Sequence, residues 1–357
     1  MTEDAAAVAA SGLPVQPPCG ENRSSVLRFH REYFQQLPGS DLSMERQHPS
    51  FFLNSLILVG IMFLYPLVGA LFLPLVTGGR MPDALLLQHD RGVVNALRIA
   101  QAAGQILVLA LPVFWISRRF SGSPGLFAPA NLRYLGIVRP DDTPALLQAA
   151  AGMLLLQPAL HTVVETQGLL LPLLGKAGRE IMLGHERLEL FVRTLAGSGT
   201  VAEFLAVAVV FAVVPACCEE LFFRGFIQRN YTVSLGPAGA VLFTGFVFAL
   251  FHMDIANLLP LTLLGWYIGY IYRRTGVLAA PAAVHATNNL AALLFLFGEE
   301  RLTAGTAFPD GYALLLEWQW WLFVLATLGL FVRLMVRFSR RTVRTEDQIT
   351  VDRHGSP

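Results

Sequence analysis

Charged side chains are scarce in this sequence, and their scarcity excludes most classes of soluble protein. Of its 357 residues, 14% are Asp, Glu, Lys or Arg, whereas 54% are hydrophobic and the mean hydropathy is +0.53. Soluble domains usually contain about 25% charged residues. The composition therefore predicts an integral membrane protein, with the lipid bilayer as its immediate surroundings.

A large net charge and a cysteine framework are also lacking. The net charge is +1, so no strong basic field attracts nucleic acid, and we expect no nucleic-acid partner. The three cysteines are Cys19, Cys217 and Cys218, and their spacing fits neither a disulfide framework nor a metal site. We interpret Cys217 and Cys218 as two small apolar side chains of a helix.

Long apolar runs, by contrast, are abundant. A membrane-spanning helix needs about 20 mostly apolar residues, and eight stretches approach that length. They lie near residues 51–76, 95–117, 144–166, 201–228, 238–254, 255–272, 277–297 and 314–337. We therefore predict an all-α, polytopic membrane protein with about eight transmembrane helices.

Two stretches fit this pattern less well. The run at 95–117 contains Arg98, Gln101 and Gln105, which weaken it as a membrane span. Residues 168–200 begin apolar and continue as an amphipathic segment. That pattern is typical of a helix at the membrane interface rather than of a ninth span.

Lys and Arg are distributed unequally between the two sides of the predicted membrane. Under the eight-span arrangement, eighteen of them lie on the side of the termini and seven on the opposite side. Because cytosolic loops carry the excess of Lys and Arg, we expect both termini in the cytosol. Tails with little cysteine and no organellar signal favour the inner (cytoplasmic) membrane of a bacterium.

The polar and apolar stretches divide the chain into five parts. We expect a polar cytosolic tail at 1–50 and another at 338–357. Between them lie N-terminal transmembrane helices with the interfacial segment at 51–200, a core at 201–297, and a last transmembrane helix at 298–337. The core carries the polar groups that suggest a function.

Ionisable groups recur inside three predicted spans, where burial in the bilayer makes them costly. In the span at 201–228, Glu220 and Arg224 are four residues apart, so they share a helix face and can pair. Glu219 lies about 100° further around the helix and faces elsewhere. One carboxylate is thus neutralised by the arginine, which leaves the other free for chemistry.

The other two spans carry imidazoles at helical spacing. Phe248 and His252 are four residues apart, and so are His285 and Asn289. Glu219, His252 and His285 lie roughly 14, 18–21 and 12 Å from the inner ends of their spans, counted at 1.5 Å per residue. The depths are similar, so the three groups can meet. Taken alone, each histidine could equally be an interhelical hydrogen-bond donor, and Phe248 is interpreted as packing.

Two further patterns have structural interpretations. Gln157, His161 and Glu165 share a helix face in the span at 144–166. His161 would lie roughly 25 Å along that span, near its outer end, so we interpret this cluster as interfacial or packing. The sequence GWYIG at 265–269 is a GxxxG pattern, which predicts a close contact between helices.

Three motifs of the core resemble a known family. CCEELFFRGF at 217–226 contains E-E-x-x-x-R, FALFH at 248–252 is F-x-x-x-H, and HATNN at 285–289 is H-x-x-x-N. In this order and spacing, over about residues 200–297, they resemble the CPBP family of intramembrane proteases. That family includes the CAAX prenyl endopeptidases of the Rce1 type and bacterial relatives. Residues 1–200 carry no such resemblance.

The resemblance implies an eight-helix membrane hydrolase that performs intramembrane proteolysis in a cavity open to the cytosol. Its substrate would be a membrane-anchored protein or peptide. By position, the resemblance assigns Glu219 and His252 to the activation of water. It assigns His285 and Asn289 to the stabilisation of the oxyanion.

The remaining motif residues are expected to support the site. The resemblance makes Glu220 and Arg224 a buttress, with Phe248 beside them. In this interpretation Glu220 binds Arg224, while Glu219 activates the water.

The cofactor remains open between none and Zn²⁺. The family is described both as metalloproteases and as glutamate proteases, and the residue types allow either. Glu219, His252 and His285 could form a His₂Glu zinc site with an open position. A carboxylate and an imidazole can equally activate water without a metal, and we favour this metal-free interpretation.

Two alternatives to an enzyme remain. The Glu and His groups could relay protons in a proton-coupled transporter, although no inverted repeat with paired broken helices is visible. The chain could also be a catalytically inactive member of the family that serves as a scaffold or immunity factor. The intact motifs disfavour that interpretation.

Overall fold

The computed structural model describes residues 48–79, 90–140, 142–302 and 311–354. These residues are almost entirely helical and contain no strand, which confirms the prediction of an all-α, polytopic membrane protein. Contacts along the chain separate Met1–Met44 from Glu45–Pro357, and the described residues all belong to the second unit. The predicted tail at 1–50 therefore lies almost wholly outside the described residues.

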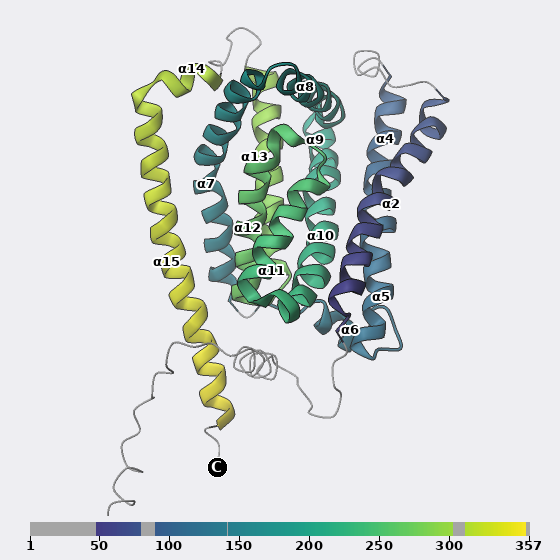
Figure 1. Cartoon of the computed structure of the whole chain (residues 1–357), viewed down its shortest axis with the longest axis vertical. Coiled ribbons are helices and arrows are strands. Elements are labelled where there is room, and N and C mark those ends of the chain that lie inside the picture. The colour runs from purple at the N-terminus through teal and green to yellow at the C-terminus, as the bar shows by residue number, and fades with distance from the viewer. Residues whose placement is uncertain (1–47, 80–89, 141, 303–310, 355–357) are drawn as a thin grey trace, which may run out of the picture. The chain divides into compact units, whose positions relative to one another are not determined.

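The axes of the long helices in this unit are roughly aligned, and α8 lies at one end of the bundle (Figure 1). In chain order they are α2 (Phe51–Thr77), α4 (Arg91–Gly104), η1 (Gln105–Ala110), α5 (Leu111–Ser121), α6 (Pro129–Tyr134), α7 (Thr143–Leu170), η2 (Leu171–Leu174), α8 (Lys176–Ala196), α9 (Val201–Ala208), η3 (Val209–Val213), α10 (Val214–Glu220), η4 (Leu221–Gln228), α11 (Arg229–Phe251), η5 (Ile255–Asn257), α12 (Leu258–Thr275), α13 (Ala279–Leu302), α14 (Gly311–Leu316) and α15 (Trp318–His354).

Seven helical segments of the described chain are long and apolar enough to cross a membrane, against about eight predicted. The difference lies in Val201–Phe251, which counts as one segment of 51 residues. At 1.5 Å per residue it would extend about 77 Å, more than twice the roughly 30 Å of a hydrocarbon core. Gly236 breaks it with φ 73° and ψ 166°, a conformation open to glycine because it has no Cβ. The two arms correspond to the fourth and fifth predicted spans.

Polar residues in the second predicted span do not interrupt its helix. Arg98 is buried, and its guanidinium donates to the carbonyl oxygens of Leu195 and Gly197 at 2.8 and 2.6 Å. It also pairs with Glu203 at 2.9 Å. Arg98 therefore joins α4 to the end of α8 and the start of α9, and its charge is satisfied there.

Two predicted boundaries are refined by the structure. Within 168–200, α7 continues to Leu170 and α8 is a separate helix that is not among the membrane-crossing candidates. At the other end of the chain, α15 runs to His354. The polar tail predicted at 338–357 is therefore helical over most of its length.

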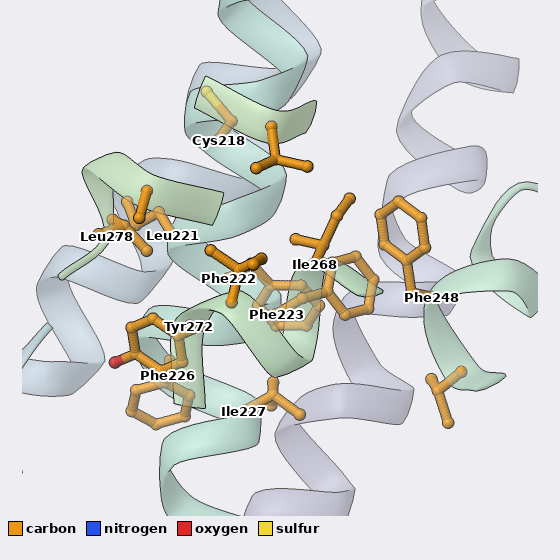
Figure 2. Close-up of a cluster of buried hydrophobic side chains, with 14 of the residues drawn as sticks. Cys218, Leu221, Phe222, Phe223, Phe226, Ile227, Phe248, Ile268, Tyr272 and Leu278 are labelled. Carbon is orange, nitrogen blue, oxygen red and sulfur yellow. The ribbon is translucent and has the colours of Figure 1, made fainter. Parts of the chain in front are cut away.

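Aromatic side chains of η4 form the centre of the hydrophobic core. Phe222, Phe223 and Phe226 are fully buried, and Ile268 of α12 packs among them (Figure 2). The Phe223 ring contacts the Phe248 ring of α11 edge-on, with centroids 5.3 Å apart. This packing holds η4, α11 and α12 together directly beside the two carboxylates of the sequence motif.

The predicted close contact at GWYIG is confirmed. A Cβ atom added to Gly265 would lie 2.6 Å from the carbonyl oxygen of Gly245, and one added to Gly245 would lie 2.4 Å from the Trp266 ring. Only glycine allows the two backbones to approach this closely. The contact fixes α12 against α11 and brings the Gly265 carbonyl next to the candidate site.

Candidate active site

Glu219 and Glu220 occupy a short α-helical stretch between two wider turns. They are the last residues of α10, which is preceded by the π-helical η3 and followed by the π-helical η4. Short π-helical stretches within α-helices occur frequently at functional sites. Both glutamates are buried, so their surroundings, rather than solvent, determine what they bind.

Glu220 is the hub of the site. Its side chain is fully buried, and its Oε1 accepts hydrogen bonds from Arg224 Nη1 at 3.0 Å and from His285 Nδ1 at 2.8 Å. The predicted pairing with Arg224 is therefore present. The bond to His285 could not be predicted from sequence spacing, because Glu220 and His285 lie on different helices.

The Arg224 side chain is completely buried among described residues. It has no exposed surface, its Nη2 donates to the Gly265 carbonyl at 3.1 Å, and its guanidinium lies 4.6 Å from the centre of the Phe248 ring. A cation over an aromatic face is stabilised by the ring quadrupole. The three residues predicted to support the site, Glu220, Arg224 and Phe248, thus lie together.

Glu219 presents its two carboxylate oxygens to different surroundings. Its Oε1 accepts a hydrogen bond from Gln105 Nε2 at 2.9 Å. Its Oε2 is buried, accepts no hydrogen bond from any described residue, and lies 4.0 Å from His285 Nε2. Leaving a buried polar atom unbonded costs free energy. Glu220 Oε2 is also unpartnered among the described residues, but Glu219 Oε2 is the one of the two that lies near His285 Nε2, where it can accept a hydrogen bond from a small polar molecule such as water.

His285 lies between the two carboxylates. Its Nδ1 faces the Glu220 oxygen, which can only accept, so we assign a hydrogen to Nδ1. That bond fixes the plane of the ring and directs Nε2 towards Glu219. The arrangement is a carboxylate that orients an imidazole next to a second carboxylate.

His252 occupies the turn directly after α11. Its Nδ1 lies 2.8 Å from the Phe248 carbonyl oxygen, and its ring centroid is 4.7 Å from that of Phe248. Phe248 in turn contacts the His285 ring at 5.6 Å. Both imidazoles therefore pack on Phe248, but the ion-pair contact of Glu219 is with His285.

The three predicted metal candidates are not gathered at one point. Among the described residues, no group of three His, Cys, Asp or Glu side chains lies close enough to hold a metal ion. Zinc in a His₂Glu site needs all three ligands at about 2.0–2.2 Å. In this arrangement Glu219, His252 and His285 do not fit such a site, because the three side chains are not grouped closely enough to share one metal ion.

Asn289 bonds to a backbone carbonyl that Pro215 leaves without its usual helical donor. Pro215 has no N–H and cannot donate to the carbonyl of Phe211, four residues earlier. Asn289 Nδ2 donates to that carbonyl at 3.2 Å. Its Oδ1 accepts from Asn288 Nδ2 at 3.1 Å, and Asn288 Oδ1 accepts from Gln157 Nε2 at 2.9 Å. The orientation of the Asn289 amide is thereby fixed at both ends.

The rival cluster of α7 does not form a single site. His161 Nδ1 lies 3.7 Å from Glu165 Oε1, and its ring packs edge-on against Trp320 of α15 with centroids 5.6 Å apart. Gln157 instead reaches Asn288 at the edge of the main site. These contacts agree with the packing interpretation of His161 and add Gln157 to the candidate site.

Sequence reasoning missed the supporting amides Gln105, Gln157 and Asn288. Gln105 was noted only as a residue that weakens a membrane span, and Gln157 only as part of the rival cluster. The signal was present in both cases, since an amide inside an apolar helix needs a partner. The partner itself lies on another helix, so the sequence could not name it.

The Glu220→Gln variant tests the hub. It removes the charge that Arg224 and His285 contact but keeps the size of the side chain. Arg224 cannot turn towards water, because it is fully buried and bonded to Gly265. We therefore expect the free energy of unfolding to fall by about 3–5 kcal/mol, measured as folded yield and thermal midpoint in detergent.

A matched control is Glu189→Gln in α8. Glu189 also pairs with an arginine four residues later, Arg193, at 3.0 Å, but these side chains are 46% and 44% exposed. Exposed pairs contribute about 0–1 kcal/mol. Equal losses in the two variants would contradict the role of Glu220 as a buried hub.

The comparisons with known proteins bear on the segment that carries these residues. A family model described as type II CAAX prenyl endopeptidase Rce1-like matches residues 201–291. No curated protein and no solved structure was found to match the chain. The matched range contains every candidate residue of α10, η4, α11 and α13, which confirms the resemblance of the three motifs. The segment that carries Glu219, Glu220 and His285 is therefore similar to the Rce1-like type II CAAX prenyl endopeptidases.

Proposed function

We propose that the chain is an intramembrane endopeptidase, which hydrolyses a peptide bond of a membrane-associated protein or peptide. One observation carries the proposal. Glu219 Oε2 is buried without a hydrogen bond from any described residue, 4.0 Å from an imidazole that Glu220 holds in place. The segment around Glu219 matches the model of a protease family, and the chain is a multi-pass membrane protein.

In this proposal Glu219 is the general base. It accepts a proton from water through Oε2, and the resulting hydroxide attacks the carbonyl carbon of the substrate. The proton then passes to the leaving nitrogen as the carbon–nitrogen bond breaks, which yields a carboxylic acid and an amine. His252 is proposed to assist Glu219 in activating the water. It would act through Nε2, because its Nδ1 is bonded to the Phe248 carbonyl.

His285 and Asn289 are proposed to stabilise the oxyanion of the tetrahedral intermediate. The Asn289 amide carries two hydrogens. One is donated to the Phe211 carbonyl at 3.2 Å, and the other is free to point at substrate. His285 would donate through Nε2, and its contact with Glu220 through Nδ1 holds the ring in place for this role. Donors fixed in advance by their neighbours suit this role, because they need no reorganisation during the reaction.

The substrate is proposed to be anchored in the bilayer. Glu219 and His285 belong to helices that are long and apolar enough to cross a membrane, so a peptide must enter the membrane to reach them. We further propose a bacterial inner membrane with both termini in the cytosol. Eighteen Lys and Arg on the side of the termini, against seven on the other, support this orientation.

The Glu219→Gln variant tests the function itself. It keeps the shape of the side chain and can still bond to Gln105, but it removes the base. We expect hydrolysis per folded molecule to fall about 10²–10⁴-fold, with the thermal midpoint unchanged. Cleavage of membrane-anchored peptides in proteoliposomes, read by mass spectrometry, measures this. Normal cleavage by Glu219→Gln would show that Glu219 is not the base, whereas absence of cleavage by the folded wild type would end the protease proposal and favour the transporter and scaffold interpretations.

Zinc content tests the choice between the metal-free and metal-dependent mechanisms. We expect purified, active protein to contain much less than one zinc per chain and to keep its activity in the presence of chelators. If the three candidates did bind zinc, the metal would be stoichiometric and its loss would remove activity. Elemental analysis of the wild type and of His252→Ala decides this: stoichiometric zinc that disappears in the variant would show the metal-free mechanism to be wrong.

The proposed orientation is tested with reporter fusions. Fusions after residues 40 and 350 should report a cytosolic location, and a fusion after residue 198, between α8 and α9, should report the opposite side. The expectation follows from the distribution of Lys and Arg. An exported signal from residue 40 or residue 350 would contradict it.

A further inference from the structure

Gln105 belongs to a part of the chain that lies outside the matched family segment, yet it contacts the proposed base. It begins η1, between α4 and α5, and its side chain is buried with 2% of its surface exposed. Its Nε2 donates to Glu219 Oε1 at 2.9 Å. No assigned motif includes it, and the proposed reaction does not use it directly.

The position of Gln105 is costly for a residue that only fills space. Its other polar atom, Oε1, is buried and has no hydrogen-bond partner among the described residues. An unpaired amide oxygen in a membrane-spanning helix loses its hydration without compensation. The Tyr65 hydroxyl lies near the same amide, but the bond from Nε2 to Glu219, at 2.9 Å, is the hydrogen bond that the geometry defines for this side chain.

That bond determines the direction of the whole Glu219 carboxylate. The two oxygens of a carboxylate move together, so fixing Oε1 on Gln105 fixes Oε2 as well. In this orientation Oε2 lies 4.0 Å from His285 Nε2 and receives no hydrogen bond from the described residues. A carboxylate without this bond would be free to rotate about its side-chain torsions, away from the reacting water.

We propose that Gln105 is a positioning residue for the general base: it holds Glu219 in the orientation that presents Oε2 to water and His285. This inference rests on the proposed function, because it requires Glu219 to be the base. It extends the active site beyond residues 201–291 to the helix of α4, η1 and α5. Gln105 does not touch the substrate, so its effect is on turnover and not on substrate binding.

The Gln105→Met variant tests the inference. Methionine is unbranched and close in size to glutamine, so it removes the amide with little change in packing. A hydrogen bond to a charged group is worth enough to change a rate by about tenfold to a hundredfold. We expect kcat per folded molecule to fall by that factor while KM for a membrane-anchored peptide stays at the wild-type value.

The structure offers a matched control in Gln228→Met. Gln228 is also buried, its Nε2 donates one hydrogen bond, to the Gly269 carbonyl at 3.0 Å, and its Oε1 is unpartnered among the described residues. It contacts neither glutamate of the site in any described interaction. Gln228→Met should lower the thermal midpoint about as much as Gln105→Met and leave kcat unchanged. Equal losses of kcat in the two variants would show Gln105 to be merely structural.

A second variant covers the case in which Gln105→Met does not fold. Gln105→Asn keeps a buried amide but shortens it by one methylene, so it no longer reaches Glu219. It should show the same loss of kcat at constant KM. Wild-type kcat in either folded variant would overturn the inference, and so would a raised KM with kcat unchanged.

Failure of this inference is distinguishable from failure of the proposed function. If Glu219→Gln is inactive and Gln105→Met is fully active, Glu219 is the base but needs no positioning by Gln105. If Glu219→Gln cleaves normally, Glu219 is not the base and Gln105 has no base to position. If the folded wild type does not cleave at all, the proposed function itself has failed.

Discussion

The site is organised around one buried carboxylate that bonds two cationic or potentially cationic groups. Glu220 accepts from Arg224 along its own helix and from His285 on α13, and Arg224 continues the chain of contacts to the Gly265 carbonyl on α12. An isolated charge in this place would be very costly, and the contacts with Arg224 and His285 offset part of its desolvation. The position of His285, and with it the distance to Glu219, depends on this one carboxylate.

Backbone irregularities make the rest of the geometry possible. Pro215 leaves the Phe211 carbonyl without its donor four residues later, and Asn289 takes that place from α13. The absence of side chains at Gly245 and Gly265 lets α11 and α12 approach until their backbones touch. A proline and two glycines, which weaken isolated helices, therefore determine how three helices meet around the glutamates.

Amides from outside the matched segment complete the site. Gln105 bonds to Glu219, and Gln157 of α7 bonds to Asn288, which in turn holds Asn289. Each lies within a helix long and apolar enough to cross a membrane, where a polar side chain is retained at a cost in free energy. The matched segment thus carries Glu219 and Asn289, and the remaining helices supply contacts that hold these two side chains in a fixed direction.

The sequence by itself determined what depends on neighbours along one helix. Apolar runs located the spans, GWYIG indicated a close contact, and the four-residue spacing paired Glu220 with Arg224, because helical geometry is the same in every protein. Whether Glu219 would meet His252 or His285 depended on how separate helices rotate and shift against each other. Local spacing carries no information about that, and glycine contacts and core packing set it. For this reason only the tertiary structure placed His285 between the two carboxylates and Gln105 on Glu219.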